Sequence, residues 1–200
     1  ASSEKSVPET SPARHCLFSA TPAIVWTGGG VHPLVYTMRQ ETVRLFTALE
    51  IPESLRSALA AVPGSLKAQL TGARWVPARS MHITLHFIGN VPRESLPELR
   101  RALSGVFPAS GTGPVSLCLT APGFFLRQGR ASLWAGVTLP EELTALHRAE
   151  GDILRRVCGL RESGAYRPHV TLARVRGASR ASLEAFLHEN ASPAWAGKSF

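Results

Sequence analysis

The sequence predicts one mixed domain of helices and strands that contains an internal duplication. A chain of 200 residues is long enough for a single domain with a full core. Hydrophobic residues make up 44% and charged residues 18%, a balance typical of folded globular proteins rather than disordered chains. Strand-like and helix-like patterns alternate along the chain, and each half ends in a strand with the pattern His-x-Thr, at His82 and at His169.

The first half begins with a strand from Thr42, where apolar and polar residues alternate. A helix is expected over residues 53–70, because a Pro-Glu pair is typical of a first helical turn and leucines follow near helical spacing. A strand over residues 81–88 and a helix over residues 94–106 complete this half.

The second half repeats the alternation of strand and helix. Its long helix should end at Gly159, because glycine readily adopts the left-handed backbone found at helix ends. The expected elements are strands over residues 115–126, 131–138 and 169–175 and helices over residues 141–158 and 179–188.

Residues 1–37 differ from the rest in composition. They are rich in Ser, Thr, Pro and Gly and show no clear periodicity, so they are expected to form a loop-like N-terminal extension. Residues 38–200 then form the working domain.

Charge and cysteine content limit the classes of function. The net charge of +8, carried mostly by arginine, favours anionic partners, of which nucleic acid is the commonest and a membrane surface the second. No apolar stretch approaches the roughly 18 residues of a transmembrane helix. Three widely spaced cysteines, Cys16, Cys118 and Cys158, form neither a disulfide framework nor a zinc motif. We therefore expect a cytoplasmic monomer with no membrane association and no cofactor.

Two nearly identical segments carry the candidate chemistry. Both read His, β-branched apolar, Thr, Leu, from His82 to Leu85 and from His169 to Leu172. Because successive strand side chains point to opposite faces, each His shares a face with its Thr while the apolar residues face the core. A single His-x-Thr pair in a strand commonly lies on a solvent-facing sheet surface. Two copies with the same surrounding apolar residues indicate a functional site.

Two histidines suit phosphodiester cleavage without a metal. A neutral imidazole can take a proton from the attacking water, and an imidazolium can give one to the leaving oxygen, since the imidazole pKa lies near neutral pH. The hydroxyls of Thr84 and Thr171 can donate hydrogen bonds to phosphate oxygens that gain charge in the transition state.

A metal site is the rival use of these residues. Strand alternation places His86 on the same face as His82, but four strand residues span about 13 Å, too far for two ligands of one zinc ion. Neither motif contains an Asp or Glu as a further ligand. No metal is therefore expected, and His86 is expected at the cleft rim or on the surface.

The two motifs resemble the signature of the two-histidine phosphoesterase superfamily. The flanking residues narrow the resemblance to the RNA 2',3'-cyclic phosphodiesterases, also called 2',5'-RNA ligases. The matching segments are residues 44–49 with Pro52, Trp75-Val76-Pro77, residues 82–89, Leu133-Trp134-Ala135-Gly136-Val137 and residues 167–174.

This resemblance implies a bilobal, pseudo-symmetric α+β fold. Two antiparallel sheets would form a central cleft with helices outside, and residues 38–200 would be the two-histidine phosphoesterase domain. The family continues into further edge strands beyond the point where this chain ends at Phe200, so its C-terminal edge strands are expected to be missing.

The resemblance also implies an activity. RNA ending in a 2',3'-cyclic phosphate would be hydrolysed to a 2'-phosphate, and the reverse reaction would join RNA through a 2',5' linkage. His82 is implied as the acid and His169 as the base. Two alternatives remain: a module that binds RNA or a nucleotide with little turnover, and a phosphodiesterase for a small cyclic nucleotide.

Further residues are candidates on weaker grounds. Arg130, by family position and charge, is a candidate substrate contact, and Tyr166 can stack on a base. We expect Phe87 to pack in the core, together with Trp75 and Trp134. His147, in a predicted helix, is expected to be structural or exposed.

Overall fold

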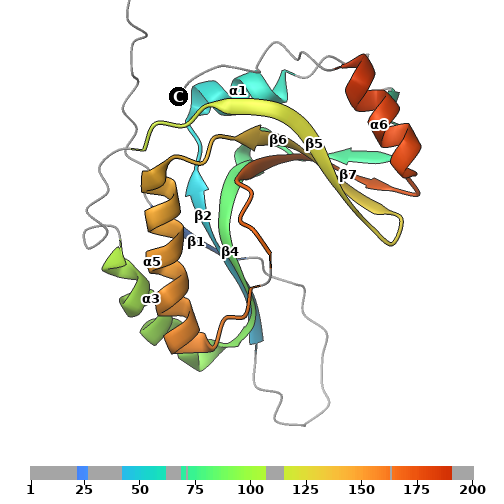
Figure 1. Cartoon of the computed structure of the whole chain (residues 1–200). Coiled ribbons are helices and arrows are strands. Elements are labelled where there is room, and N and C mark those ends of the chain that lie inside the picture. The colour runs from blue at the N-terminus through green and yellow to red at the C-terminus, as the bar shows by residue number, and fades with distance from the viewer. Residues whose placement is uncertain are drawn as a thin grey trace, which may run out of the picture.

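The computed structural model describes residues 22–26, 42–61, 69–70, 72–106, 115–162 and 164–190 (Figure 1). The strands are β1 (Pro22–Trp26), β2 (Thr42–Glu50), β3 (Ala73–Trp75), β4 (His82–Pro92), β5 (Leu119–Arg127), β6 (Arg130–Val137) and β7 (His169–Arg176). The α-helices are α1 (Glu53–Ala60), α3 (Leu96–Ser104), α5 (Glu141–Cys158) and α6 (Arg180–Glu189), and the short 3₁₀ turns are η1 (Ala78–Ser80) and η2 (Arg93–Ser95).

Most of the expected elements are present, with differences at their ends. Helix α5 ends at Cys158 as expected, and Gly159 adopts a left-handed φ of 65° there. Helix α1 ends at Ala60 instead of about residue 70, and residues 62–68 lie outside the described residues. The helix expected over residues 94–106 begins as η2 and continues as α3.

Two strands were not expected from the sequence. Strand β1 lies in the N-terminal segment predicted to be loop-like, and it pairs with β2 from Pro22 opposite Leu49 to Trp26 opposite Leu45. Strand β3 has three residues, too few for a periodic pattern to be visible.

Among the described residues, all strands belong to one antiparallel sheet, rather than to the two that were predicted, and this sheet connects the two halves. Its order is β1-β2-β4-β7-β6-β5, with β3 also paired to β7. Strands β4 and β7 meet through the single pair Ile83–Val170, because β3 takes a later part of the same β7 edge. The halves are therefore joined by a very short ladder at the centre of one sheet.

Each motif strand contains a β-bulge at the leucine that follows its threonine. In β4, Thr84 pairs with Ala48 and His86 with Thr47, so Leu85 is the extra residue. In β7, Thr171 pairs with Trp134 and Ala173 with Leu133, so Leu172 is the extra residue. A bulge resets the alternation of side chains, so the residues after each leucine change faces.

The core has two parts that correspond to the two halves. The larger packs the apolar face of β2 and β4 against α1, α3 and α5, with Leu45, Leu59 and Leu146 at most 1% exposed. The smaller packs β6 and β7 against α6 through Leu133, Val175, Leu183 and Phe186. Figure 1 shows α3 and α5 side by side on one half and α6 at the other end of the sheet. Fully burying each such leucine contributes about 1.5–3 kcal/mol.

Within the described ranges, no helix is both long enough and apolar enough to cross a bilayer.

Candidate active site

The two His-x-Thr motifs lie side by side at the centre of the sheet. Ile83 of β4 pairs with Val170 of β7, and both side chains are buried. One step either way along this antiparallel pair places His82 beside Thr171 and Thr84 beside His169. The four polar side chains therefore share the face opposite the apolar core, related by approximate two-fold symmetry.

The same kind of hydrogen bond orients both histidines. The Nδ1 atom of His82 lies 2.8 Å from the carbonyl oxygen of Ser80, and Nδ1 of His169 lies 2.8 Å from that of Arg167. Because a carbonyl oxygen only accepts, each Nδ1 must carry a proton and donate it. In the neutral ring, Nε2 is then left with a lone pair for proton transfer.

The surroundings lower the pKa of both histidines. Burial is the largest cause for each. The positive charges that His169 and Arg174 can carry lower the pKa of His82 further, whereas its bond to Ser80 raises it. Burial of both rings and the positive charge of a protonated His169 therefore disfavour a state with two imidazolium ions.

Aromatic rings hold the two imidazoles in different ways. The ring of His82 stacks on Phe46, with centroids 4.9 Å apart. The ring of His169 meets Phe125 edge-on at 5.1 Å and lies 5.9 Å from Trp134. Trp134 in turn covers Gly123 so closely that a Cβ there would lie 2.3 Å from the indole. Only glycine leaves room for Trp134 in this position.

A cleft of about 350 Å³ opens beside the motifs. Thr84 and His169 line it, as do Phe87, Phe125 and Tyr166. Its volume is within the roughly 300–1,000 Å³ of small-molecule sites, enough for a nucleotide.

Phe87 and His86 do not lie where the sequence predicted. Phe87 was expected in the core but is 64% exposed and lines the cleft. His86 was expected at the rim or surface, on the face of His82, but it is 1% exposed and faces α5. The bulge at Leu85 causes both differences, because it reverses the alternation that placed them.

The structure does not bring Arg130 to the histidines. Arg130 pairs with Arg176 at one end of the β6–β7 ladder, and His169 pairs with Gly136 at the other, six residues or about 20 Å away along the strand. Arg174 is the arginine whose charge reaches His82. It was missed as a site residue because it follows the bulge, where simple alternation gives the wrong face.

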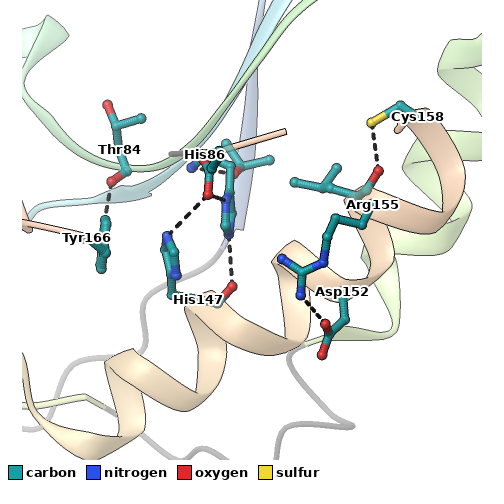
Figure 2. A network of polar contacts seen from close by, with 10 residues as sticks. Thr84, His86, His147, Asp152, Arg155, Cys158 and Tyr166 are labelled. Atoms are coloured by element: carbon teal, nitrogen blue, oxygen red, sulfur yellow. Dashed lines mark hydrogen bonds and ion pairs between the residues drawn. The ribbon is translucent and has the colours of Figure 1, made fainter. Parts of the chain in front are cut away.

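Tyr166 lines the cleft, as a substrate contact should, but its hydroxyl is used within the protein. It donates a 3.0 Å hydrogen bond to the carbonyl oxygen of Thr84 (Figure 2). Burial and the nearby Glu150 and Glu162 carboxyls raise the pKa of Tyr166, so the hydroxyl keeps its proton. Its ring stacks on that of His147 in α5, with centroids 3.9 Å apart, so Tyr166 bridges β4 and α5.

The two tryptophans expected in the core are only partly buried. Trp75 packs between the two core clusters. Trp134 lies beside His169 and Phe125, so it belongs to the site wall as much as to the core.

The fold and site define an α+β protein with a central antiparallel sheet and paired His-x-Thr strands. Residues 51–198 match the 2'-5' RNA ligase superfamily, and the chain belongs to that superfamily. This confirms the family expected from the two motifs.

Several relatives are named RNA 2',3'-cyclic phosphodiesterase. The one from Archaeoglobus fulgidus is 29% identical over 135 residues, covering 67% of this chain and 73% of the relative. The one from Thermus thermophilus is 30% identical over 140 residues, covering 66% and 68%.

Solved structures share the fold. TT0787 of Thermus thermophilus matches with a TM-score of 0.60 and 26% identity, over 78% of this chain and 82% of that one. LigT of E. coli in its apo form matches with a TM-score of 0.53 and 27% identity, over 70% and 75%.

Proposed function

We propose that this protein hydrolyses RNA 2',3'-cyclic phosphate ends to 2'-phosphates, with His82 and His169 as the only acid and base. The observation that carries the proposal is the paired geometry. Each imidazole donates from Nδ1 to the carbonyl two residues before it, which leaves both Nε2 atoms for proton transfer. The relatives named RNA 2',3'-cyclic phosphodiesterase support the substrate class.

The proposed reaction needs one neutral and one protonated ring. His169 takes a proton from water, whose oxygen bonds to phosphorus as the bond from phosphorus to O3' breaks. His82 gives its proton to the departing O3', which becomes the 3'-hydroxyl and leaves the phosphate on O2'. The lowered pKa values favour the neutral ring that the base requires. When a 5'-hydroxyl takes the place of water as the nucleophile, its oxygen bonds to phosphorus as the bond to O3' breaks, and a 2',5' linkage forms.

The phosphate contacts in this proposal come from three side chains. Thr84 and Thr171 lie beside the opposite motif's histidine and can donate hydrogen bonds to the non-bridging oxygens. Arg174, whose charge reaches His82, supplies the cation in place of Arg130. A guanidinium binds a phosphate through two parallel hydrogen bonds, which also fixes its orientation.

Two exposed aromatic side chains support RNA as the substrate. Phe87 and Phe125 are 64% and 41% exposed, and both line the cleft that contains His169. Exposed rings beside a phosphate site are typical of proteins that stack single-stranded bases. The net charge of +8 favours a polyanion.

Hydrolysis of an RNA oligonucleotide ending in a 2',3'-cyclic phosphate, in excess EDTA, tests the proposal. Phosphorus NMR should show the cyclic phosphate converted to a 2'-phosphate at an unchanged rate. Loss of activity in EDTA, in protein that stays folded by circular dichroism, would contradict the metal-free mechanism. Faster turnover of a mononucleotide 2',3'-cyclic phosphate than of the oligonucleotide would favour the small-nucleotide alternative, and tight binding without turnover the binding module.

A further inference from the structure

Two histidines and a glutamate meet on the opposite face of β4 from His82. Nδ1 of His86 in β4 lies 2.8 Å from Oε2 of Glu162, and Nε2 of His147 in α5 lies 3.9 Å from the same oxygen. One ligand atom from each residue lies within 4.8 Å of the others. Figure 2 shows His86 and His147 facing each other between β4 and α5.

His86 presents a lone pair, not a proton, to Glu162 when its ring is neutral. Its Nε2 lies 2.9 Å from the carbonyl oxygen of His147, so Nε2 must be the donor. Nδ1 is fully buried and, among the described residues, forms no hydrogen bond of acceptable geometry. A buried imidazole that donates one nitrogen to a backbone carbonyl and points the other at a carboxylate is oriented as metal ligands are.

His147 is prepared in the same way. Its ring stacks on that of His86 with centroids 4.1 Å apart, and its Nε2 lies 3.9 Å from Oε2 of Glu162. His147 therefore presents a ring nitrogen to the same carboxylate oxygen that His86 faces.

The packing of α5 leaves room for this arrangement at Gly151. A Cβ at this position would lie 3.1 Å from Cε1 of His86, so glycine allows the helix to approach the ring. Glycine inside a helix costs about 1 kcal/mol relative to alanine. The buried carboxyl of Glu150 lies on the same side and interacts with His86.

We propose that His86, His147 and Glu162 bind one zinc ion. Zinc takes imidazole and carboxylate ligands at about 2.0–2.2 Å, which puts neighbouring ligand atoms about 3.3 Å apart in a tetrahedron. The observed separations of 2.8 and 3.9 Å lie on either side of that value. His147 and Glu162 also line the cleft, so a water or a substrate oxygen can take the fourth position.

The site departs from the expectation of no metal, which considered His86 only together with His82. It is separate from the proposed hydrolysis, which needs only His82 and His169. An ion there would link Glu162 to β4 and α5.

Zinc binding to the full chain tests the proposal without any turnover. After EDTA treatment and dialysis against zinc, elemental analysis should find one zinc per chain, and isothermal titration should give the same stoichiometry. His147→Gln and Glu162→Gln should each weaken binding by more than about 100-fold, because loss of a ligand exceeds the 10–100-fold effect of losing its support. Exposed residues of α6 provide matched controls, and His188→Gln and Glu184→Gln should bind zinc as the parent does.

Cobalt in place of zinc gives a spectroscopic readout of how many ligands the site provides. Bound cobalt should show the intense visible absorption of a four-coordinate site with nitrogen ligands. The double variant His82→Ala/His169→Ala should be inactive yet keep its zinc. Absence of binding, or binding that the double variant abolishes and the His147 and Glu162 variants leave intact, would overturn the proposal. The 2.8 Å contact of His86 with Glu162 would then be a contact within the fold only, with the proposed hydrolysis unaffected.

Discussion

The two motif strands use the same backbone for different purposes. Both β4 and β7 carry His-x-Thr-Leu followed by a bulge at the leucine. The next residue is then buried and the one after it exposed, which gives His86 and Phe87 in β4 but Ala173 and Arg174 in β7. The duplicated bulge therefore provides one aromatic and one cationic side chain on the polar face. On the opposite, buried face of the sheet, the bulge places a histidine in β4 and a small apolar residue in β7.

The two strands place different side chains beside the two motif histidines. Arg174 of β7 reaches the histidine of β4, and Phe87 of β4 lines the cleft with the histidine of β7. Each strand thus completes the environment of the other strand's histidine. In the proposed mechanism, the two histidines therefore have different neighbours although their motifs are alike.

The largest expected effect tests whether the two motifs are both required. His82→Ala and His169→Ala should each lower kcat by about 10²–10⁴-fold, since each removes one proton-transfer group. Single-turnover kinetics on the cyclic-phosphate oligonucleotide measures this, with His188→Ala on α6 as the control. If either variant kept the parent rate, the matching histidine would be neither acid nor base.

A smaller loss of activity is expected for Arg174, the arginine that β7 places on the polar face of the sheet. Arg174→Gln should lower kcat/KM by roughly 10- to 100-fold, because a hydrogen bond to a charged group contributes about 1.5–3 kcal/mol. Arg130→Gln and Arg176→Gln, at the far end of the same ladder, should change it little. Equal losses in all three variants would point to general attraction of a polyanion rather than a contact at the phosphate.

Arg174→Gln should also move the pH profile. The positive charge of Arg174 lowers the pKa of His82, so its removal raises that pKa. The limb of the bell-shaped kcat/KM profile that His82 controls should therefore shift to higher pH, while the other limb stays in place. A shift to lower pH, or no shift, would contradict the placement of Arg174 beside His82.

The aromatic side chain that only β4 supplies should act on binding. Phe87→Ala should raise KM for an oligonucleotide by roughly 5- to 100-fold with kcat nearly unchanged, because stacking contributes about 1–3 kcal/mol per base. Leu139→Ala is the matched control, since Leu139 is exposed but does not line the cleft. An unchanged KM would mean that Phe87 contacts no base.

The smallest expected effect lies beneath β4, where polar groups replace an apolar core. Burial raises the pKa of Glu150, so the stability that it contributes is full below its unfolded pKa and is lost as pH rises through the folded value. In EDTA, Glu150→Gln should therefore raise Tm by a few degrees at pH 8 and less at pH 5. Glu142→Gln, exposed on the same helix, should show no such trend, and a lower Tm for Glu150→Gln at pH 8 would mean that a charged Glu150 stabilises the fold.

The sequence by itself determined the motifs, the family and most of the elements. Two copies of His-x-Thr-Leu are readable without coordinates, and a two-residue period puts His82 with Thr84 and His169 with Thr171. The long helix α5 and its stop at Gly159 follow from apolar spacing and from the freedom of glycine at positive φ. These features are local, and local patterns are what a sequence displays directly.

Only the tertiary structure decided what lies beyond each leucine. A bulge depends on how a strand pairs with its neighbours, so strand alternation placed His86 and Phe87 on the wrong faces and gave no role to Arg174. Whether the halves form one sheet or two depends on the single pair Ile83–Val170 and on β3 beside it. The meeting of His86 with His147 and Glu162 likewise joins residues far apart in the chain, because α5 packs against the buried face of β4.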